Sequence, residues 1–495
     1  MKKFFEEHDL AKFVLGILLV IVIASWIIPT GSFGYGGAFT EGEMGRIGLV
    51  HMVYAFTFAI QNYSIQIGYL LVIGIFYGVM THTEGYKALV EKLAKFGKKK
   101  EVLFSLVVSF IIAFLASFLN NSFILLAFIP LVITVLRKMG FDKISAFATT
   151  FGSILVGVLG ATYGTEGLGA ILTYLTYGGI QAKVSSLILV RFGILALAFI
   201  IYSFFLVRYN KKQFAKKKND EVIEDDLFYV DEPKKKKTKV WPTVTIFAIL
   251  FVLAILGFIT WNVNPNGETI FGITIFDDFH KWLMGIKIGS DDGFAIFKTI
   301  VGNVLPGYSY DISPALGSWY LFNYSTLLLV VTIITAFISR MKVDEFFTNA
   351  YEGIKKVAKP TLFLVLAYVS FVLLYFSPIM PTIVNEIGKL SNGAFNPFVM
   401  TLQAFVGSIF NTDIGFLSYT VMYSFSNFAD KGEIVFLIYL TIFGLVSFVT
   451  PIATFLLYGL SFMDIKYTKW FKYIWKFFVA MLVCLVVIFA LLTYL

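Results

Sequence analysis

The stretch ISAFATTFGSILVGVLGATYGTEGLGAILTYLTYG, residues 144–178, is apolar at both ends and polar in the middle. Its centre, GATYGTEG at 160–167, contains three glycines and Glu166. Each glycine costs a helix about 1 kcal/mol relative to alanine, and a carboxylate inside a membrane span usually marks an ion or solute path. The stretch therefore predicts a membrane helix broken at 160–167. The alternative is that Glu166 lies in a loop at the membrane surface.

The whole chain has the composition of a membrane protein. Of its 495 residues, 58% are hydrophobic and only 14% are charged, and apolar stretches near the length of a membrane span recur throughout. This predicts an all-α polytopic protein of the cell membrane, with about 10–12 transmembrane helices. The net charge of +9 comes from Lys and Arg between the apolar stretches, which indicates cytoplasmic loops and argues against nucleic-acid binding. A single cysteine and four scattered histidines predict no disulfide, no multi-cysteine metal site and no cofactor.

A charged linker at 209–240 separates two halves that resemble each other. The linker contains ten lysines and seven acidic residues, which predicts a cytoplasmic, poorly ordered segment. It divides a first repeat (1–208) from a second repeat (241–465), and a C-terminal transmembrane helix follows at 466–495. Five short matches occur in the same order in both halves and indicate internal duplication, which is common in secondary transporters. The matches are Trp26 with Trp261, the Lys/Glu-rich arms at 81–100 and 339–360, Leu103-Phe104 with Leu362-Phe363, Val108-Ser109-Phe110 with Val369-Ser370-Phe371, and Gly152-Ser153-Ile154 with Gly407-Ser408-Ile409.

In the first half, a polar tip interrupts the apolar stretch before the broken helix. Residues 104–119 lead into Asn120-Asn121-Ser122, and apolar residues then continue to 136. Basic residues flank both outer ends, so both ends favour the same membrane face. This predicts a re-entrant helical hairpin at about 101–138 whose amide and hydroxyl groups bind solute. The alternative is an ordinary loop between two full spans.

The second half repeats this order. Phe376-Ser-Pro-Ile-Met-Pro-Thr382 contains two prolines that remove backbone donors, which predicts a hairpin at about 361–395 or a proline-kinked span. A second broken helix is predicted at about 398–425, with Asn411-Thr412-Asp413 at its break. These three residues offer oxygen ligands for a hard cation, so we predict a Na⁺ site there. Glu166, which has fewer polar neighbours, is the candidate for proton coupling.

With hairpin and broken helix present twice, the chain resembles the ion-transporter superfamily, and within it the YfcC/DcuC group of C4-dicarboxylate and basic amino-acid carriers. The resemblance rests on WIIPTGSF at 26–33, the stretch 121–140 followed by Phe141-Asp142, and PIATFLLYGLSFMDIKYTKWFK at 451–472. It implies inverted repeats, a homodimer and elevator-like movement of the hairpins and broken helices against a scaffold. The basic residues in both Lys/Glu-rich arms favour the alternative, a parallel arrangement of the repeats. The candidate solute-binding residues are Asn120, Asn121, Ser122, Thr162, Thr165, Glu166, Ser377, Thr382, Asn411, Thr412 and Asp413.

The function favoured by the sequence is a secondary active transporter. It is expected to move a small polar solute, either an amino acid or a carboxylate, coupled to Na⁺ or H⁺ or by exchange, with basic amino-acid antiport as one form. The expected partners are the solute and the lipid bilayer. A membrane-embedded enzyme and an ion channel are the alternatives. The four histidines form no catalytic set, and no selectivity-filter signature is present.

Overall fold

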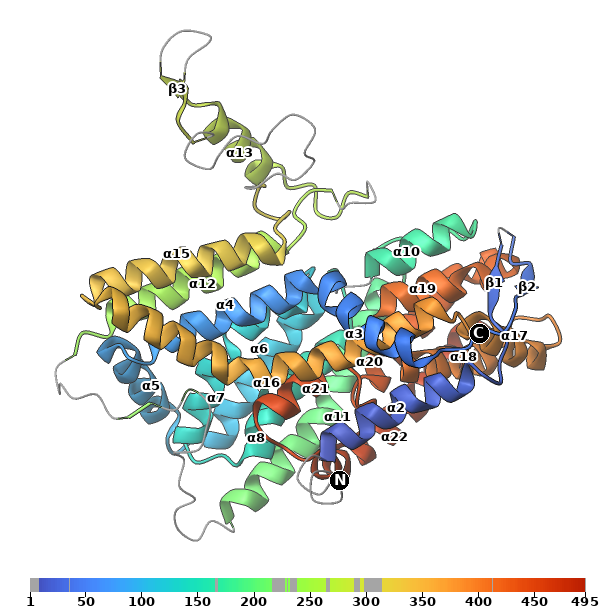
Figure 1. Cartoon of the computed structure of the whole chain (residues 1–495), viewed down its shortest axis with the longest axis horizontal. Coiled ribbons are helices and arrows are strands. Elements are labelled where there is room, and N and C mark those ends of the chain that lie inside the picture. Colours follow the sequence, from blue (N-terminus) through green and yellow to red (C-terminus); the bar gives the residue numbers. More distant parts are fainter. Residues whose placement is uncertain are drawn as a thin grey trace.

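The computed structural model describes residues 9–34, 36–164, 168–215, 228, 230–231, 238–263, 268–288, 294–297, 314–411 and 413–494. Helices make up nearly all of its regular structure, which confirms the predicted all-α membrane fold. The described strands form two small antiparallel hairpins, β1 (Gly31–Phe33) with β2 (Phe39–Glu41) and β3 (Lys287–Ile288) with β4 (Phe294–Ala295). In Figure 1, α13 (Ile275–Gly285) and β3 project from one side of the helical body.

The described helices follow one another along both halves of the chain. The first half contains α2 (Asp9–Ala24), α3 (Leu49–Asn62), α4 (Ser64–Met80), α5 (Glu84–Gly97), α6 (Glu101–Phe118), η1 (Ser122–Ala127), α7 (Ile129–Lys138), α8 (Lys143–Phe147), η2 (Ala148–Gly152), α9 (Ser153–Leu159), α10 (Leu168–Tyr177) and α11 (Ile188–Ala215). The second half contains α12 (Trp241–Phe258), α13, α15 (Leu321–Ile338), α16 (Val343–Phe376), α17 (Met380–Gly388), η3 (Lys389–Ser391), α18 (Pro397–Phe410), α19 (Ile414–Val421), η4 (Met422–Lys431), α20 (Gly432–Val446), α21 (Thr454–Phe462) and α22 (Tyr467–Tyr494).

Six of the described helices are long and apolar enough to cross a membrane. They are α6, α11, α12, α15, α16 and α22, and α3 with α4, which meet at a bend of 66°, make a seventh if they form one span. Shorter apolar helices occupy 143–159, 168–177 and 397–410. The predicted count of about 10–12 crossings includes such broken spans, which are too short to meet a length criterion one by one.

The packing of the helices repeats between the two halves. In the first half α6, α9 and α11 pack against one another, and in the second half α18, α20 and α22 do the same. Between the halves, α9 packs against α20, α11 against α22 and α4 against α16. This correspondence pairs α6 with α18, α9 with α20 and α11 with α22, so the structure contains two structural repeats.

The repeat packing moves two second-half elements away from their predicted positions. The junction between α18, which ends at Phe410, and α19, which begins at Ile414, corresponds in packing to the junction between α6 and η1, where the first hairpin tip is predicted. The segment 447–453 between α20 and α21 corresponds to the segment that follows α9, where the first broken helix is predicted. The region predicted as the second hairpin, 361–395, instead contains the end of the continuous helix α16 and α17, which packs on α18 and β1. Pro378 ends α16, because a proline disfavours helical backbone in the residue before it.

The crossing of α4 and α16 brings two backbones into direct contact. A Cβ atom added to Gly353 of α16 would lie 2.0 Å from the carbonyl oxygen of Gly74 in α4. A Cβ on Gly78 would lie 2.3 Å from the carbonyl oxygen of Asn349. Only glycine fits at these positions, as is typical of close helix crossings in membranes. Figure 1 shows α16 passing along the body beside α4.

The charged linker is more ordered than predicted in its described parts. α11 continues through Ala215, so the first residues of the predicted linker are helical. Phe228 is fully buried, with its ring 5.4 Å from that of Tyr77 and 6.2 Å from that of Phe462. Burying a phenylalanine side chain stabilises a fold by about 1.5–3 kcal/mol, so Phe228 attaches the linker to the helical body.

Candidate functional site

The chain breaks converge on one cavity, which we call the Asp413 cavity. Its volume is about 240 Å³. The first hairpin tip and η1, the reversal before α19 and the break before α21 all contribute to its wall, together with the bend between α3 and α4. The lining residues are Tyr63, Gln66, Ser122, Phe123, Leu155, Val158, Ala170, Tyr368, Asp413, Ile414, Gly415, Phe443, Ser447, Ala453, Thr454 and Phe455.

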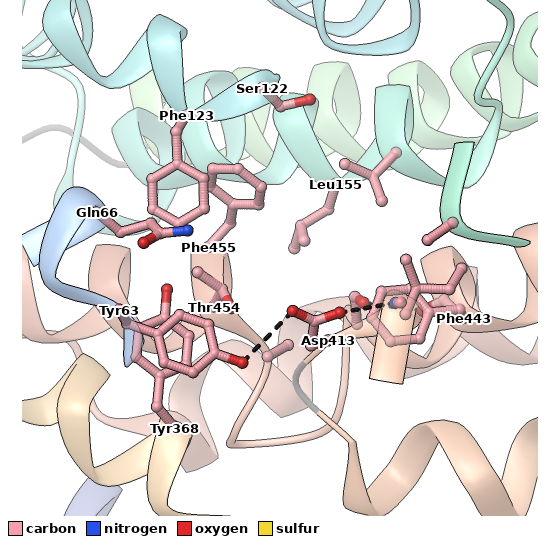
Figure 2. Close-up of a pocket in the computed structure, with 16 residues that line it drawn as sticks. Tyr63, Gln66, Ser122, Phe123, Leu155, Tyr368, Asp413, Phe443, Thr454 and Phe455 are labelled. Atoms are coloured by element: carbon pink, nitrogen blue, oxygen red, sulfur yellow. Dashed lines mark hydrogen bonds between the residues drawn. The ribbon is translucent and has the colours of Figure 1, made fainter. Parts of the chain in front are cut away.

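Asp413 is held in place by the start of α19. Its Oδ1 accepts hydrogen bonds from the backbone amides of Gly415 at 2.7 Å and Phe416 at 3.1 Å. Aspartate is a preferred N-cap because its side chain satisfies these otherwise unpaired amides. Its Oδ2 lies 3.4 Å from the hydroxyl oxygen of Tyr63, and Figure 2 shows this contact across the cavity. One carboxylate oxygen therefore fixes the helix while the other is presented to the cavity.

Aromatic rings form much of the wall around Asp413. Tyr63, at the bend between α3 and α4, stacks on Tyr368 of α16 with ring centroids 3.5 Å apart. Phe123 and Phe455 meet with their centroids 5.0 Å apart. Figure 2 shows both pairs on the same side of the cavity as Gln66. The faces of such rings attract cations, so the wall suits an ammonium group or a metal ion beside the carboxylate.

The hydroxyl groups of the cavity differ in what they can offer. Ser122 donates its proton to the carbonyl of Ala116 at 3.0 Å, and Ser447 donates to that of Phe443 at 2.8 Å. Each therefore presents lone pairs to the cavity. The Thr454 side chain also lines the cavity, and its hydroxyl makes no hydrogen bond within the described part of the chain, so it can donate to a ligand. Hydrogen-bond acceptors and donors thus occur in the same cavity.

The start of α21 is the second polar element of the cavity. Its N-cap residue is Ala453, which offers no side-chain hydrogen bond to the first turn. The amides of this turn and the helix dipole together favour a negative group. Ala453, Thr454 and Phe455 all line the cavity. An anionic group can therefore bind at α21 while a cation is bound at Asp413.

Among the described lining residues, Asp413 is the one acidic residue, and none is a lysine or arginine. An anion that enters the cavity consequently meets no basic side chain from the described part of the wall, and its own charge adds to that of the Asp413 carboxylate. Such a charge in a low-dielectric site is costly unless a cation or a proton accompanies it. The cavity thus favours binding of a solute together with a positive charge.

The other predicted residues of the first half stabilise the hairpin tip and the break. The Nδ2 of Asn120 donates to the Thr260 hydroxyl at 2.7 Å, and the Oδ1 of Asn121 accepts from the amide of Phe123 at 2.9 Å. Thr162 is buried and donates to the carbonyl of Ser117 at 2.9 Å. Of this group, Ser122 alone lines the Asp413 cavity. Thr165 and Glu166 lie outside the described residues.

The predicted residues of the second half divide between two places. Asn411 donates to the carbonyl of Gly407 at 2.8 Å, and its buried Oδ1 has no hydrogen-bond partner among the described residues. Thr412 lies outside the described residues, so the Na⁺ site at 411–413 stays a prediction. Thr382 donates to the carbonyl of Pro29 at 2.8 Å beside β1, and Ser377 lies next to Gly45. Neither Ser377 nor Thr382 lines the Asp413 cavity.

Sequence reasoning did not identify several residues of the wall. Tyr63, Gln66 and Tyr368 lie in helices that read as ordinary apolar spans. Ser447 and Thr454 flank a break without an acidic residue, and the signal that could have revealed it is the sequence Thr450-Pro451 within an otherwise apolar stretch. Among the described residues, no group of three or more His, Cys, Asp or Glu side chains could hold a metal ion.

The fold and the cavity together define a polytopic α-helical membrane protein with a polar site between helix breaks. The model of the C4-dicarboxylate anaerobic carrier family (DcuC) matches residues 9–494, and the chain belongs to this family. The protein is therefore a multi-pass membrane protein of a carrier family, which points to a transporter rather than an enzyme.

Comparison with solved structures found matches to two transporters at low identity. The YdaH transporter of Alcanivorax borkumensis is 12% identical, with 98% of each chain covered and a TM-score of 0.41. MtrF of Neisseria gonorrhoeae, described as illuminating a class of antimetabolite efflux pumps, is 14% identical, with 97% of this chain and 94% of that chain covered and a TM-score of 0.38. No curated protein matches the chain.

Proposed function

We propose that the protein is a secondary transporter of a small carboxylate solute, which binds in the Asp413 cavity together with a cation or a proton. The observation that carries the proposal is the pairing of a cavity-facing carboxylate with an uncapped helix start in one cavity. The solute carboxylate binds at the first turn of α21 and the Thr454 hydroxyl. The positive charge binds at Asp413.

The absence of a basic side chain from the described wall supports ion coupling. A C4-dicarboxylate carries two negative charges, and Asp413 adds a third. Binding in a low-dielectric cavity then requires compensating cations, either Na⁺ at the Asp413 and serine oxygens or a proton on Asp413. Uptake of the solute is consequently expected to depend on a gradient of the ion that is bound with it.

A second candidate solute is an amino acid. The aromatic wall formed by Tyr63, Tyr368, Phe123 and Phe455 beside a carboxylate suits an ammonium group. An amino acid brings its own positive charge, so exchange of one amino acid for another needs no coupling ion. Antiport, including basic amino-acid exchange, belongs to this candidate.

The family membership also supports a proposal for movement and assembly. We extend the proposal to a homodimer in which the hairpins and broken helices move in an elevator-like manner, with inverted repeats. The close crossing of α4 and α16 supports a rigid scaffold, because its backbones are in contact and cannot slide without clashes.

The test is transport by the purified protein in proteoliposomes. Labelled succinate, aspartate and lysine are compared under imposed Na⁺ and pH gradients, each with counterflow by unlabelled solute. Saturable succinate uptake that requires one gradient supports the first candidate, and gradient-independent counterflow of aspartate or lysine supports the second. Ionic conductance without counterflow would indicate a channel. No flux of any of these solutes, from protein that is folded and correctly inserted, would contradict the proposed function.

A further inference from the structure

A second cavity lies apart from the Asp413 cavity, and we call it the lysine cavity. Its volume is about 250 Å³, and four lysines contribute to its wall. They come from the start of α8 and from the polar part of α16, and the end of α21 closes the other side. The lining residues are Ile133, Lys143, Lys355, Lys356, Lys359, Pro360, Ser461, Phe462, Met463 and Asp464.

The charges of this cavity are only partly compensated. Lys355 pairs with Glu352 at 2.7 Å, and Lys359 pairs with Asp464 at 3.4 Å. Lys143 and Lys356 make no ion pair within the described part of the chain. The Lys356 ammonium instead lies 5.1 Å from the ring centroid of Phe228, the buried residue of the linker. Within the described part of the chain, two of the four lysines therefore have no carboxylate within ion-pair distance.

The buried hydroxyl of Ser461 also indicates that the lysine cavity can bind an anion. The Oγ of Ser461 is buried and has no hydrogen-bond partner among the described residues. Burying a hydroxyl without a partner costs about 1–3 kcal/mol. An anion in the lysine cavity would accept from Ser461 and from the lysine ammonium groups at the same time.

We propose that the lysine cavity binds a phosphate group, carried either by an anionic lipid headgroup or by a soluble phosphate. A phosphate presents several acceptor oxygens in a tetrahedral arrangement, so it can pair with ammonium groups from two helices and with one hydroxyl. Basic pockets between helices at the cytoplasmic side are suited to such headgroups. The neighbouring linker carries lysine clusters and indicates that this end of the molecule is cytoplasmic.

The position of the cavity gives the bound phosphate a structural role. α21 has nine residues, so its ends are about 13 Å apart at 1.5 Å per residue. Thr454 at its start lines the Asp413 cavity, and Ser461 and Phe462 at its end line the lysine cavity. Lys143 likewise begins the helical segment that leads to Leu155 and Val158 of the Asp413 cavity. A phosphate here ties α16 to α8 and α21 and stabilises their packing.

The experiment measures the melting temperature of the full-length protein in neutral detergent. Sodium phosphate and a short-chain phosphatidylglycerol are titrated separately, with sodium chloride at equal ionic strength as the reference. A rise in Tm with phosphate alone identifies a soluble ligand, and a rise with phosphatidylglycerol only identifies a lipid headgroup. Each juxtamembrane lysine contributes about 1 kcal/mol to such binding, so the Lys143→Gln/Lys356→Gln variant should bind about 25-fold more weakly.

Two further measurements separate this proposal from a general effect of charge. Lys469→Gln removes an exposed lysine of α22, five residues after Asp464 but outside the lysine cavity. This variant should leave the midpoint of the phosphate or phosphatidylglycerol titration unchanged. Without ligand, the double variant should melt at or above the wild-type temperature, because two repelling charges are removed. If the double variant fails to fold, Ser461→Ala should still weaken binding several-fold. The proposal is overturned if neither probe raises Tm above the chloride reference, or if the variants keep the wild-type midpoint.

Discussion

Replacement of Asp413 by asparagine separates the charge of this residue from its structural role. The Oδ1 of Asp413 accepts the amides of Gly415 and Phe416, and an asparagine Oδ1 can accept the same two hydrogen bonds. Asparagine and aspartate are similarly good N-cap residues. The variant therefore keeps the start of α19 and loses the negative charge that faces Tyr63 and the cavity.

The expected effect on solute binding follows from the loss of the charged partner of the cation or proton that binds together with the solute. A hydrogen bond to a charged group contributes about 1.5–3 kcal/mol, which corresponds to about 10- to 150-fold in affinity. The KM for counterflow of the transported solute should rise by this factor in Asp413→Asn proteoliposomes. The dependence on the coupling gradient should weaken with it, while the melting temperature of the purified protein stays close to that of the wild type.

A matched pair of alanine variants controls for the capping role. The Oδ1 of Asn396 accepts the amides of Phe398 and Val399 at the start of α18, outside the Asp413 cavity. Asp413→Ala and Asn396→Ala both lose an N-cap and should both be destabilised by about 0.5–2 kcal/mol. Only Asp413→Ala should lose transport. Unchanged KM and unchanged coupling in a folded Asp413→Asn protein would refute the assignment of the charge to cation binding.

Three other predictions concern different parts of the structure. Thr454→Val should raise the KM for the solute about five- to tenfold through loss of one hydrogen bond, whereas Thr493→Val in α22 should leave the KM unchanged. If Thr454→Val has the same KM as the wild type, Thr454 does not bind the solute. Gly353→Ala should lower the free energy of unfolding by about 1–3 kcal/mol by overpacking, because its Cβ would lie 2.0 Å from the Gly74 carbonyl oxygen. Gly68→Ala, whose Cβ would have no atom within 4 Å, should not destabilise α4. A lower melting temperature for Gly68→Ala than for Gly353→Ala would contradict the close packing of α4 against α16. In the amphipathic helix α5, the hydrogen bond from Lys95 and the charges of Lys95 and Lys138 lower the pKa of Glu91 below its usual 4.5. The stabilising effect of Glu91 is therefore complete above pH 4.5 and is lost as the pH falls through the lowered pKa. The melting temperatures of the wild type and Glu91→Gln should converge in acid, and a difference that stays constant with pH would show that the ion pairs are not the cause.

The features that could be predicted from the sequence are polar groups whose burial in the membrane costs free energy. Polar residues at membrane depth must be satisfied by neighbouring groups or face a cavity. This reasoning identified the tip at 120–122 and the break at 411–413, and the structure brings Ser122 and Asp413 to one cavity. The division of labour predicted between Glu166 and Asp413 stays a prediction, because Glu166 lies outside the described residues.

The features that were missed depend on long-range packing. Tyr63, Gln66 and Tyr368 are unremarkable in sequence. Tyr63 and Gln66 reach the cavity because α3 and α4 meet at a bend of 66°, and Tyr368 of α16 stacks on Tyr63 there. The second-half elements were shifted because short matches such as Gly152-Ser-Ile with Gly407-Ser-Ile aligned helices that do not correspond in packing. Ser377 and Thr382 were predicted as solute-binding residues because Pro378 and Pro381 interrupt the helical pattern between them. A proline interrupts a helix whether or not a ligand binds there, so this signal does not identify a binding site.

The anchoring of Phe228 has a consequence for how the two halves of the protein could be made separately. A gene divided between Ala215 and Phe228 would leave the anchor on the C-terminal fragment, where its ring must find Tyr77 of the other fragment after synthesis. A division between Val230 and Trp241 would instead leave it on the fragment that contains Tyr77. Phe228 therefore docks on the other fragment in both cases, against Tyr77 in the first pair and against Phe462 and Lys356 in the second.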